Sequence, residues 1–132
     1  IKITDPNMNR LIFSKSDAAK LINKAINKCD SGDGGFVCSY KMKSVNMFDM
    51  AQTIAYEGYI SEIQVVGKRP GEKVNEDLIS ENEIPFTYVE GDMIYIYNKQ
   101  NDGTNKLTKG YSSASAEKMT EEEIKDLIWI TK

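Results

Sequence analysis

The sequence contains no histidine, which removes the side chain that most often carries acid–base catalysis and zinc binding near neutral pH. Only two cysteines are present, Cys29 and Cys38, too few for a disulfide framework or a cysteine metal site. They either form a single bridge or stay reduced, and we favour reduced thiols. No apolar run approaches the roughly 20 residues needed to cross a bilayer, so we expect no membrane partner.

The sequence also lacks the Ser-His-Asp, Cys-His, Walker and dinucleotide-binding patterns. Catalysis by carboxylates alone is the remaining enzymatic alternative, but no spaced acidic pair stands out. The acidic residues 121–126 are typical of a solvated helix start. The stretch 30–35 is typical of a glycine-rich turn, because Lys41 stands where a calcium loop needs its closing glutamate. We therefore expect a protein that is not an enzyme, with no small-molecule substrate, cofactor or metal.

The charge of the chain is unevenly distributed. The net charge is −3, yet residues 1–43 carry eight Lys or Arg against four Asp. A polyanion would therefore meet the front of the chain, while the acidic remainder faces solvent or basic proteins. With 132 residues, the chain fits one domain. We predict an N-terminal extension at residues 1–15 and a single α/β domain at residues 16–132.

Two helices are predicted in the first half of this domain. The first runs from a cap at Ser16 to about Cys29, with apolar residues on one face. The second runs over residues 46–57, with Ser44 as its cap. Gly58 follows it, where a left-handed C-terminal cap belongs.

The remaining elements complete an α/β (α+β) fold. Strands are expected at residues 36–42 and 59–66, the latter with Ile60, Ile63 and Val65 in the core, and a hairpin at residues 86–97. Residues 69–85 are acidic and aperiodic, which indicates a surface insertion. Thr120 and Glu123 form a capping box for a short C-terminal helix. We predict an open mixed sheet of about three or four strands with two helices on one face.

One candidate binding surface follows the first predicted strand. Lys41 and Lys43 alternate at the strand end, and Ser44 opens the next helix, whose free N–H groups attract anions. This pattern fits a phosphate-binding surface for RNA. It fits an ordinary solvent-exposed strand end equally well.

Several short motifs, in order, resemble the small-subunit ribosomal protein eight family. Residues 17–25 (DAAKLINKA) match the first helix of that family, and Glu57-Gly58-Tyr59-Ile60 matches the end of its second helix. Residues 93–97 resemble its third strand, and residues 106–110 (KLTKG) resemble its basic turn without the proline. The chain ends where the C-terminal domain of that family begins, and such divergence is typical of a mitochondrial ribosome.

This resemblance implies a structural protein of the small ribosomal subunit. Its partners would be small-subunit ribosomal RNA and other ribosomal proteins, in a mitochondrial or, alternatively, a cytoplasmic ribosome. The alternative function is an acidic protein–protein adaptor without RNA binding. The residues expected to contact RNA are Lys20, Asn23, Lys24, Lys28, Lys41, Lys43, Ser44, Lys106 and Lys109.

Overall fold

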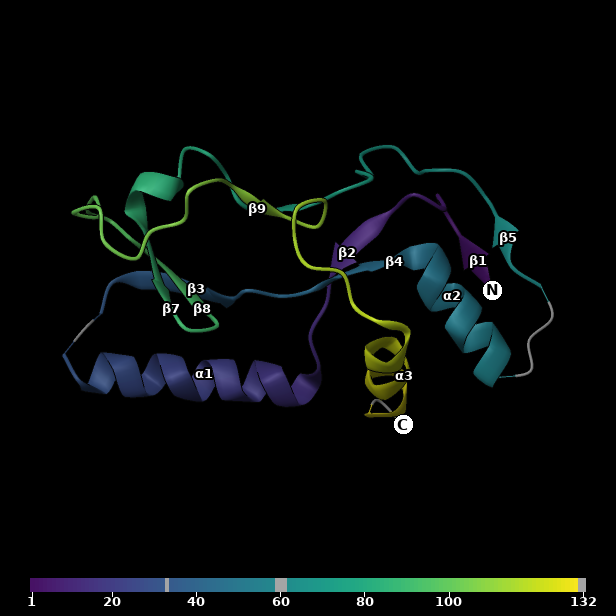
Figure 1. Cartoon of the computed structure of the whole chain (residues 1–132), viewed down its shortest axis with the longest axis horizontal. Coiled ribbons are helices and arrows are strands. Elements are labelled where there is room, and N and C mark those ends of the chain that lie inside the picture. The colour runs from purple at the N-terminus through teal and green to yellow at the C-terminus, as the bar shows by residue number, and fades with distance from the viewer. Residues whose placement is uncertain (33, 59–61, 131–132) are drawn as a thin grey trace. The chain divides into compact units, whose positions relative to one another are not determined.

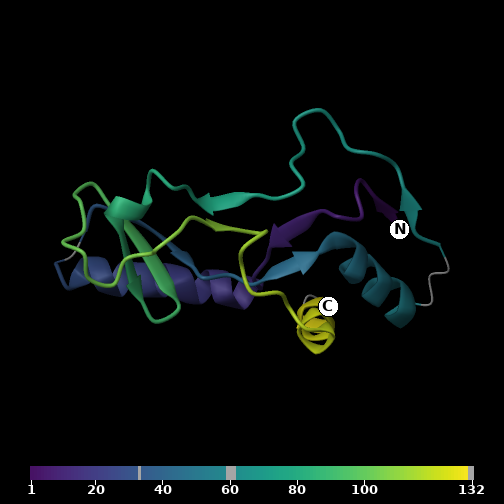
Figure 2. The same ribbon diagram turned by 45° about the horizontal axis from the view of Figure 1, so that its top comes forward.

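A computed structural model describes residues 1–32, 34–58 and 62–130 (Figure 1; Figure 2 turns the view by 45°). The α+β class expected from the sequence is confirmed, with the strands distributed over several small sheets. The chain forms two compact units, each assembled from separate segments. Unit 1 contains residues 1–14, 42–76 and 112–132, and unit 2 contains residues 15–41 and 77–111.

The described residues of unit 1 form two small sheets and two helices. One sheet pairs β1 (Lys2–Ile3) with β5 (Gln64–Val65) in parallel, and the other pairs β2 (Asn9–Leu11) with β4 (Ser44–Asn46) antiparallel. The helices are α2 (Met47–Glu57) and α3 (Glu121–Ile130), which pack against each other. The first 14 residues, expected to belong to an extension, therefore supply two strands of this unit. Among the residues whose burial is described, the buried apolar residues of unit 1 are Ile3, Met8, Val45, Ala51, Ala116, Ile124 and Leu127.

The start of α2 differs from the prediction. Asn46 is the N-cap, and its side-chain oxygen accepts from the backbone N–H groups of Phe48 and Asp49 at 2.8 and 3.1 Å. Ser44 cannot serve as the cap because it lies inside β4, where it is fully buried. Its hydroxyl donates instead to the carbonyl of Ser113 at 2.6 Å. The helix prediction is otherwise confirmed within one residue at its start.

The predicted end of α2 is wrong in its conformation. Gly58 has φ −95° and ψ 3°, which is right-handed backbone. Its N–H donates to the carbonyl of Ile54 at 2.8 Å, so the last turn closes as ordinary helix and needs no left-handed residue. Of the strand predicted at residues 59–66, residues 59–61 lie outside the described part of the chain. Only Gln64–Val65 forms a strand, and Val65, expected in the core, is 52% exposed.

Unit 2 contains α1 (Lys15–Asp30) and a three-stranded antiparallel sheet. The sheet order is β3 (Phe36–Tyr40), β8 (Met93–Tyr97) and β7 (Thr87–Glu90), and Figures 1 and 2 show α1 running beside it. The predicted hairpin is confirmed, because Glu90 pairs with Met93 and leaves a two-residue turn with Gly91 at φ 58°. Met93, Ile94 and Tyr95 of β8 are consecutive and all buried, so this part of the central strand is covered on both faces.

Three shorter elements complete the description: β6 (Asp77–Ile79), the 3₁₀ helix η1 (Ile84–Phe86) and β9 (Tyr111–Ser112). The element β6 lies within the segment expected to be a surface insertion, and η1 begins at its end. Ile79 in β6 is only 2% exposed, so this part of the segment contributes to a core.

Candidate functional site

A basic turn in unit 1 begins the candidate site. Residues 69–72 read Arg-Pro-Gly-Glu, with proline and then glycine in the middle, the arrangement typical of a type II turn. Gly71 has φ 85°, and the N–H of Glu72 donates to the carbonyl of Arg69 at 3.1 Å. The Glu72 carboxylate accepts from the N–H of Arg69 at 2.9 Å. The turn is thus closed by its own backbone and side chains, which restricts the position of Arg69.

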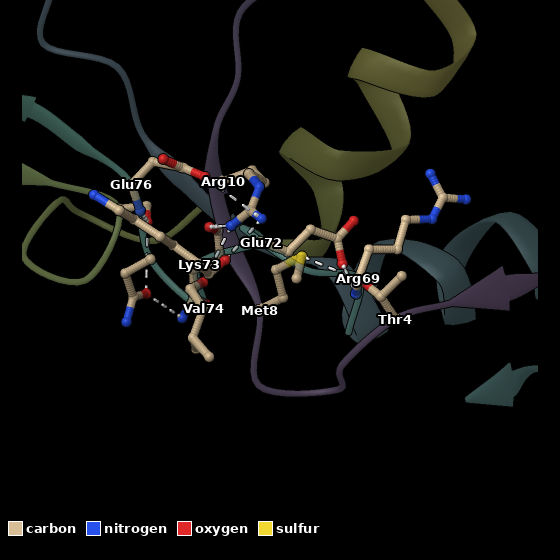
Figure 3. Close-up of polar contacts among 11 residues, drawn as sticks. Thr4, Met8, Arg10, Arg69, Glu72, Lys73, Val74 and Glu76 are labelled. Carbon is tan, nitrogen blue, oxygen red and sulfur yellow. Dashed lines mark hydrogen bonds and ion pairs between the residues drawn. The ribbon is translucent and has the colours of Figure 1, made fainter. Parts of the chain in front are cut away.

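Arg10 of β2 fixes the segment that follows the turn (Figure 3). Its guanidinium donates to the carbonyls of Val74 at 3.1 Å, Lys73 at 2.9 Å and Asn9 at 2.7 Å. The N–H of Asn9 also donates to the carbonyl of Val74 at 2.9 Å. Because Arg10 joins carbonyls from two chain segments, it holds residues 73–74 against β2.

Further polar contacts extend this attachment. The Asn9 amide donates to the side-chain oxygen of Asn75 at 2.9 Å. The N–H of Glu76 donates to the hydroxyl of Ser113 at 2.9 Å, and the N–H of Ser113 donates to the carbonyl of Glu76 at the same distance. The whole segment from Arg69 to Glu76 is therefore anchored inside unit 1.

The cations of this segment differ in their availability. Arg69 and Lys73 are exposed, and within the described residues neither side chain has a hydrogen-bond or ion-pair partner. Figure 3 shows the Arg69 guanidinium extending away from the contacts around Arg10. Lys68 lies 3.7 Å from Asp5, and Arg10 lies 3.7 Å from Glu76. Chemically, the turn presents guanidinium and ammonium donors to an anion, and the described residues contain no cluster of metal-ligating side chains.

The lysines of α1 that were predicted to contact RNA form ion pairs within unit 2. Lys24 contacts Asp92 and Lys28 contacts Glu90, each at 2.9 Å. The hydrogen bond with Asp92 raises the pKa of Lys24. Lys20 contacts Asp17 at 3.1 Å, and Asn23 is exposed on the same helix. Most of the positive charge of α1 is thus already balanced by acidic neighbours.

The remaining predicted residues are dispersed over the chain. Lys43 contacts both Glu117 and Glu123 at 2.7 Å, and these hydrogen bonds raise its pKa. Ser44 is 0% exposed, which excludes it from any surface contact. The side chains that are exposed belong to Lys41, Lys106 and Lys109.

Sequence reasoning placed residues 69–72 in a surface insertion and assigned them no function, and it missed Arg10 entirely. The turn had a usable signal in the Arg-Pro-Gly-Glu order, which predicts a fixed loop presenting an arginine. Arg10 had no signal, because the carbonyls of Lys73 and Val74 that it binds lie 63 and 64 residues away along the chain.

Comparison with known proteins gives consistent results. A sequence model of the polysaccharide biosynthesis protein family matches residues 1–99. The chain is 35% identical over 136 residues to a protein of Methanocaldococcus jannaschii described as an uncharacterized membrane protein. It is 24% identical to Pen from Bacillus thuringiensis, whose X-ray structure superimposes with a TM-score of 0.82 over the whole of this chain. The chain spans 40% of the length of each of these two proteins.

These similarities overturn the ribosomal interpretation. The resemblance to the small-subunit ribosomal protein eight family is wrong, because the family match covers most of the chain and points elsewhere. The ribosomal RNA and ribosomal-protein partners, the adaptor alternative and the mitochondrial or cytoplasmic ribosome location are withdrawn with it. The expectation of no membrane partner is withdrawn too, since one relative is described as a membrane protein. Within the described residues, no helix combines the length and the apolar character that crossing a bilayer requires.

Proposed function

The chain belongs to the polysaccharide biosynthesis protein family, and we propose that its part in that biosynthesis is to bind a phosphate-activated sugar at the turn Arg69–Glu72. Sugar hydroxyls are poor leaving groups, so the building blocks of polysaccharides carry phosphate or diphosphate esters. Such esters are anions with oxygens arranged to accept hydrogen bonds. Guanidinium groups match this geometry with two parallel donors, which makes an exposed arginine on a fixed turn a suitable receptor.

The observation that supports this proposal most strongly is the anchoring of residues 69–76. The guanidinium of Arg10 is engaged in holding the segment, and the turn closes on itself. The backbone of residues 69–76 therefore needs little further ordering when a ligand binds. Arg69 and Lys73 remain exposed, with no partner for either side chain in the part of the chain that the structure describes. A surface loop held this firmly while presenting unpaired cations fits recognition better than a purely structural role.

We also propose that these 132 residues bind without supplying a catalytic group. The sequence offers no histidine. Around the turn, the acidic side chains Glu72 and Glu76 are engaged with backbone N–H or guanidinium groups. The chemistry of the longer relatives would then depend on residues outside the part that matches this chain. The measurement is turnover of a phosphate-activated sugar by the chain alone, where we expect none.

Calorimetric titration with inorganic diphosphate and with glucose 1-phosphate tests the binding proposal. We expect both anions to bind the wild-type chain more weakly as salt increases. Arg69→Gln should weaken binding about tenfold, the effect of losing one charge-assisted contact of about 1.4 kcal/mol. Lys109→Gln is the matched control, because it removes an exposed cation in unit 2 and should leave the affinity unchanged. Equal affinities for wild type and Arg69→Gln would contradict the proposal.

A further inference from the structure

Helix α1 has one broad apolar side, of which only the inner face packs within unit 2 while the adjoining outer face stays exposed. The inner face carries Leu21 and Ala25, both half-buried in unit 2. The outer face carries an exposed stripe, in which Ile22 is 60% and Ile26 51% exposed. No residue of this helix reaches full burial. We call the outer stripe the α1 stripe, and its residues are Ala19, Ile22, Ile26 and Cys29.

The spacing within the α1 stripe identifies the kind of element that would cover it. Its residues follow one another at intervals of three, four and three positions, which is the repeat of a helix seam packed against a second helix. A small residue at one end and two branched residues in the middle provide the alternating profile that such packing uses. The stripe therefore fits another helix better than a loop or an extended peptide.

The neighbouring strand β3 is open in the same unit. In the described residues β3 pairs only with β8, so its other edge is unpaired. The sequence Phe36–Tyr40 contains no charge and no proline, the features that normally protect an edge strand. Val37 is 67% exposed on this strand. An unprotected edge of this kind is a template for an additional strand.

The size of the surface decides between a separate partner and the same polypeptide. A stripe of four side chains and one short strand edge buries far less than the roughly 1,200 Å² of a stable complex between two molecules. The same contacts suffice within one chain, where the effective concentration is high. Both relatives have the extra length, since this chain spans only 40% of each.

We infer that the α1 stripe packs against a helix and that the open edge of β3 pairs with a strand. Both elements would come from the part of the family's polypeptide that lies outside the region matching this chain. The strand would extend the β3–β8–β7 sheet, and the helix would pack on α1 as a second layer. This surface would then join unit 2 to the remainder of the longer protein, independently of the anion-binding turn in unit 1.

The test compares one substitution in two lengths of protein. Ile26→Asp is introduced into this 132-residue chain and, at the aligned position, into the full-length relative of Methanocaldococcus jannaschii. In this chain the side chain is half in water, so thermal unfolding should shift by less than about 2 °C. In the full-length relative a buried carboxylate should lower the Tm by about 5–10 °C. Asn27→Asp, which adds the same charge on the exposed polar side of α1, should leave both proteins unchanged.

Two results would overturn the inference. If Ile26→Asp shifts the Tm equally little in this chain and in the full-length relative, nothing covers the α1 stripe in the longer polypeptide. A stable dimer of the wild-type chain by light scattering, lost in Ile26→Asp, would assign the stripe to a second copy instead. Hydrogen exchange separates the strand from the helix, because slower exchange of residues 36–40 in the full-length relative supports the added strand and unchanged exchange contradicts it.

Discussion

Arg10 joins β2 to residues 73–74, and we expect the stability of unit 1 to depend on it. Arg10→Met keeps most of the aliphatic stem but removes every donor to the three carbonyls. The loss should lower the free energy of unfolding by about 1–3 kcal/mol, the range for charge-assisted hydrogen bonds. Urea titration followed by circular dichroism measures the change. Glu76→Gln is the control, since its ion pair with Arg10 is long and half exposed and should contribute roughly 0–1 kcal/mol. Equal losses in the two variants would contradict this role.

Gly110 is a second single residue with a specific requirement. A Cβ atom there would lie 3.0 Å from the carbonyl oxygen of Ile79 and 3.0 Å from the carboxylate of Glu81. The carboxylate could move, but the backbone carbonyl of β6 cannot. Gly110→Ala should therefore lower the free energy of unfolding by about 1–3 kcal/mol through overpacking.

The matched control for Gly110 is Gly34, where an added Cβ meets no atom of the described residues within 4 Å. Gly34→Ala should change the free energy of unfolding by less than about 0.5 kcal/mol in the same urea titration. If both alanine variants unfold at the wild-type midpoint, the close approach around Gly110 is not a constraint in solution.

At the level of elements, the start of α3 combines a capping box with an ion pair. The hydroxyl of Thr120 accepts from the N–H of Glu123 at 3.2 Å, and the Glu123 carboxylate accepts from the N–H of Thr120 at 2.8 Å. Thr120→Ala should lower the free energy of unfolding by about 1 kcal/mol. Thr120→Ser, which keeps the hydroxyl, should retain most of the stability. Thermal unfolding of the two variants and the wild type measures the difference.

The same element gives the stability of unit 1 a dependence on pH. The hydrogen bond from Lys43, followed by that from the Thr120 backbone, lowers the pKa of Glu123 below its usual 4.5. A carboxyl group with a lowered folded-state pKa stabilises the fold above its unfolded pKa, and this contribution is lost as pH falls through the folded value. The Tm should thus decline below about pH 4.5, and the decline should be shallower in Glu123→Gln. An identical acid profile for both proteins would contradict this assignment.

Elements specified by neighbouring residues were predictable from the sequence. The capping box at Thr120, the hairpin at Gly91 and the body of α2 depend on interactions within four residues, and all three are confirmed. The N-cap of α2 was not predictable in this way. Ser44 and Asn46 have equal capping chemistry, and the choice is made by the pairing of β4 with β2, which buries Ser44.

For the molecule as a whole, the sequence predicted the α+β class but not the family or the site. The ribosomal resemblance relied on short motifs such as residues 57–60, which are common at helix ends, and matching order alone could not distinguish one family from another. The candidate site depends on contacts between residues 10 and 73–76, a separation that no local pattern encodes. Only the turn at residues 69–72 could have drawn attention to it.

The interleaving of segments leads to a last prediction about the whole chain. Unit 1 needs residues 112–132, because α3 packs on α2 and Ser44 binds both Ser113 and the backbone of residues 117–119. A protease site inserted between Asp102 and Gly103, in an exposed loop, should thus give two fragments that stay associated after cleavage. Native mass spectrometry should detect the complex, and urea should separate its components. If native mass spectrometry detects the fragment beginning at Gly103 only on its own, the contacts of α3 and Ser113 with residues 42–76 do not hold unit 1 together.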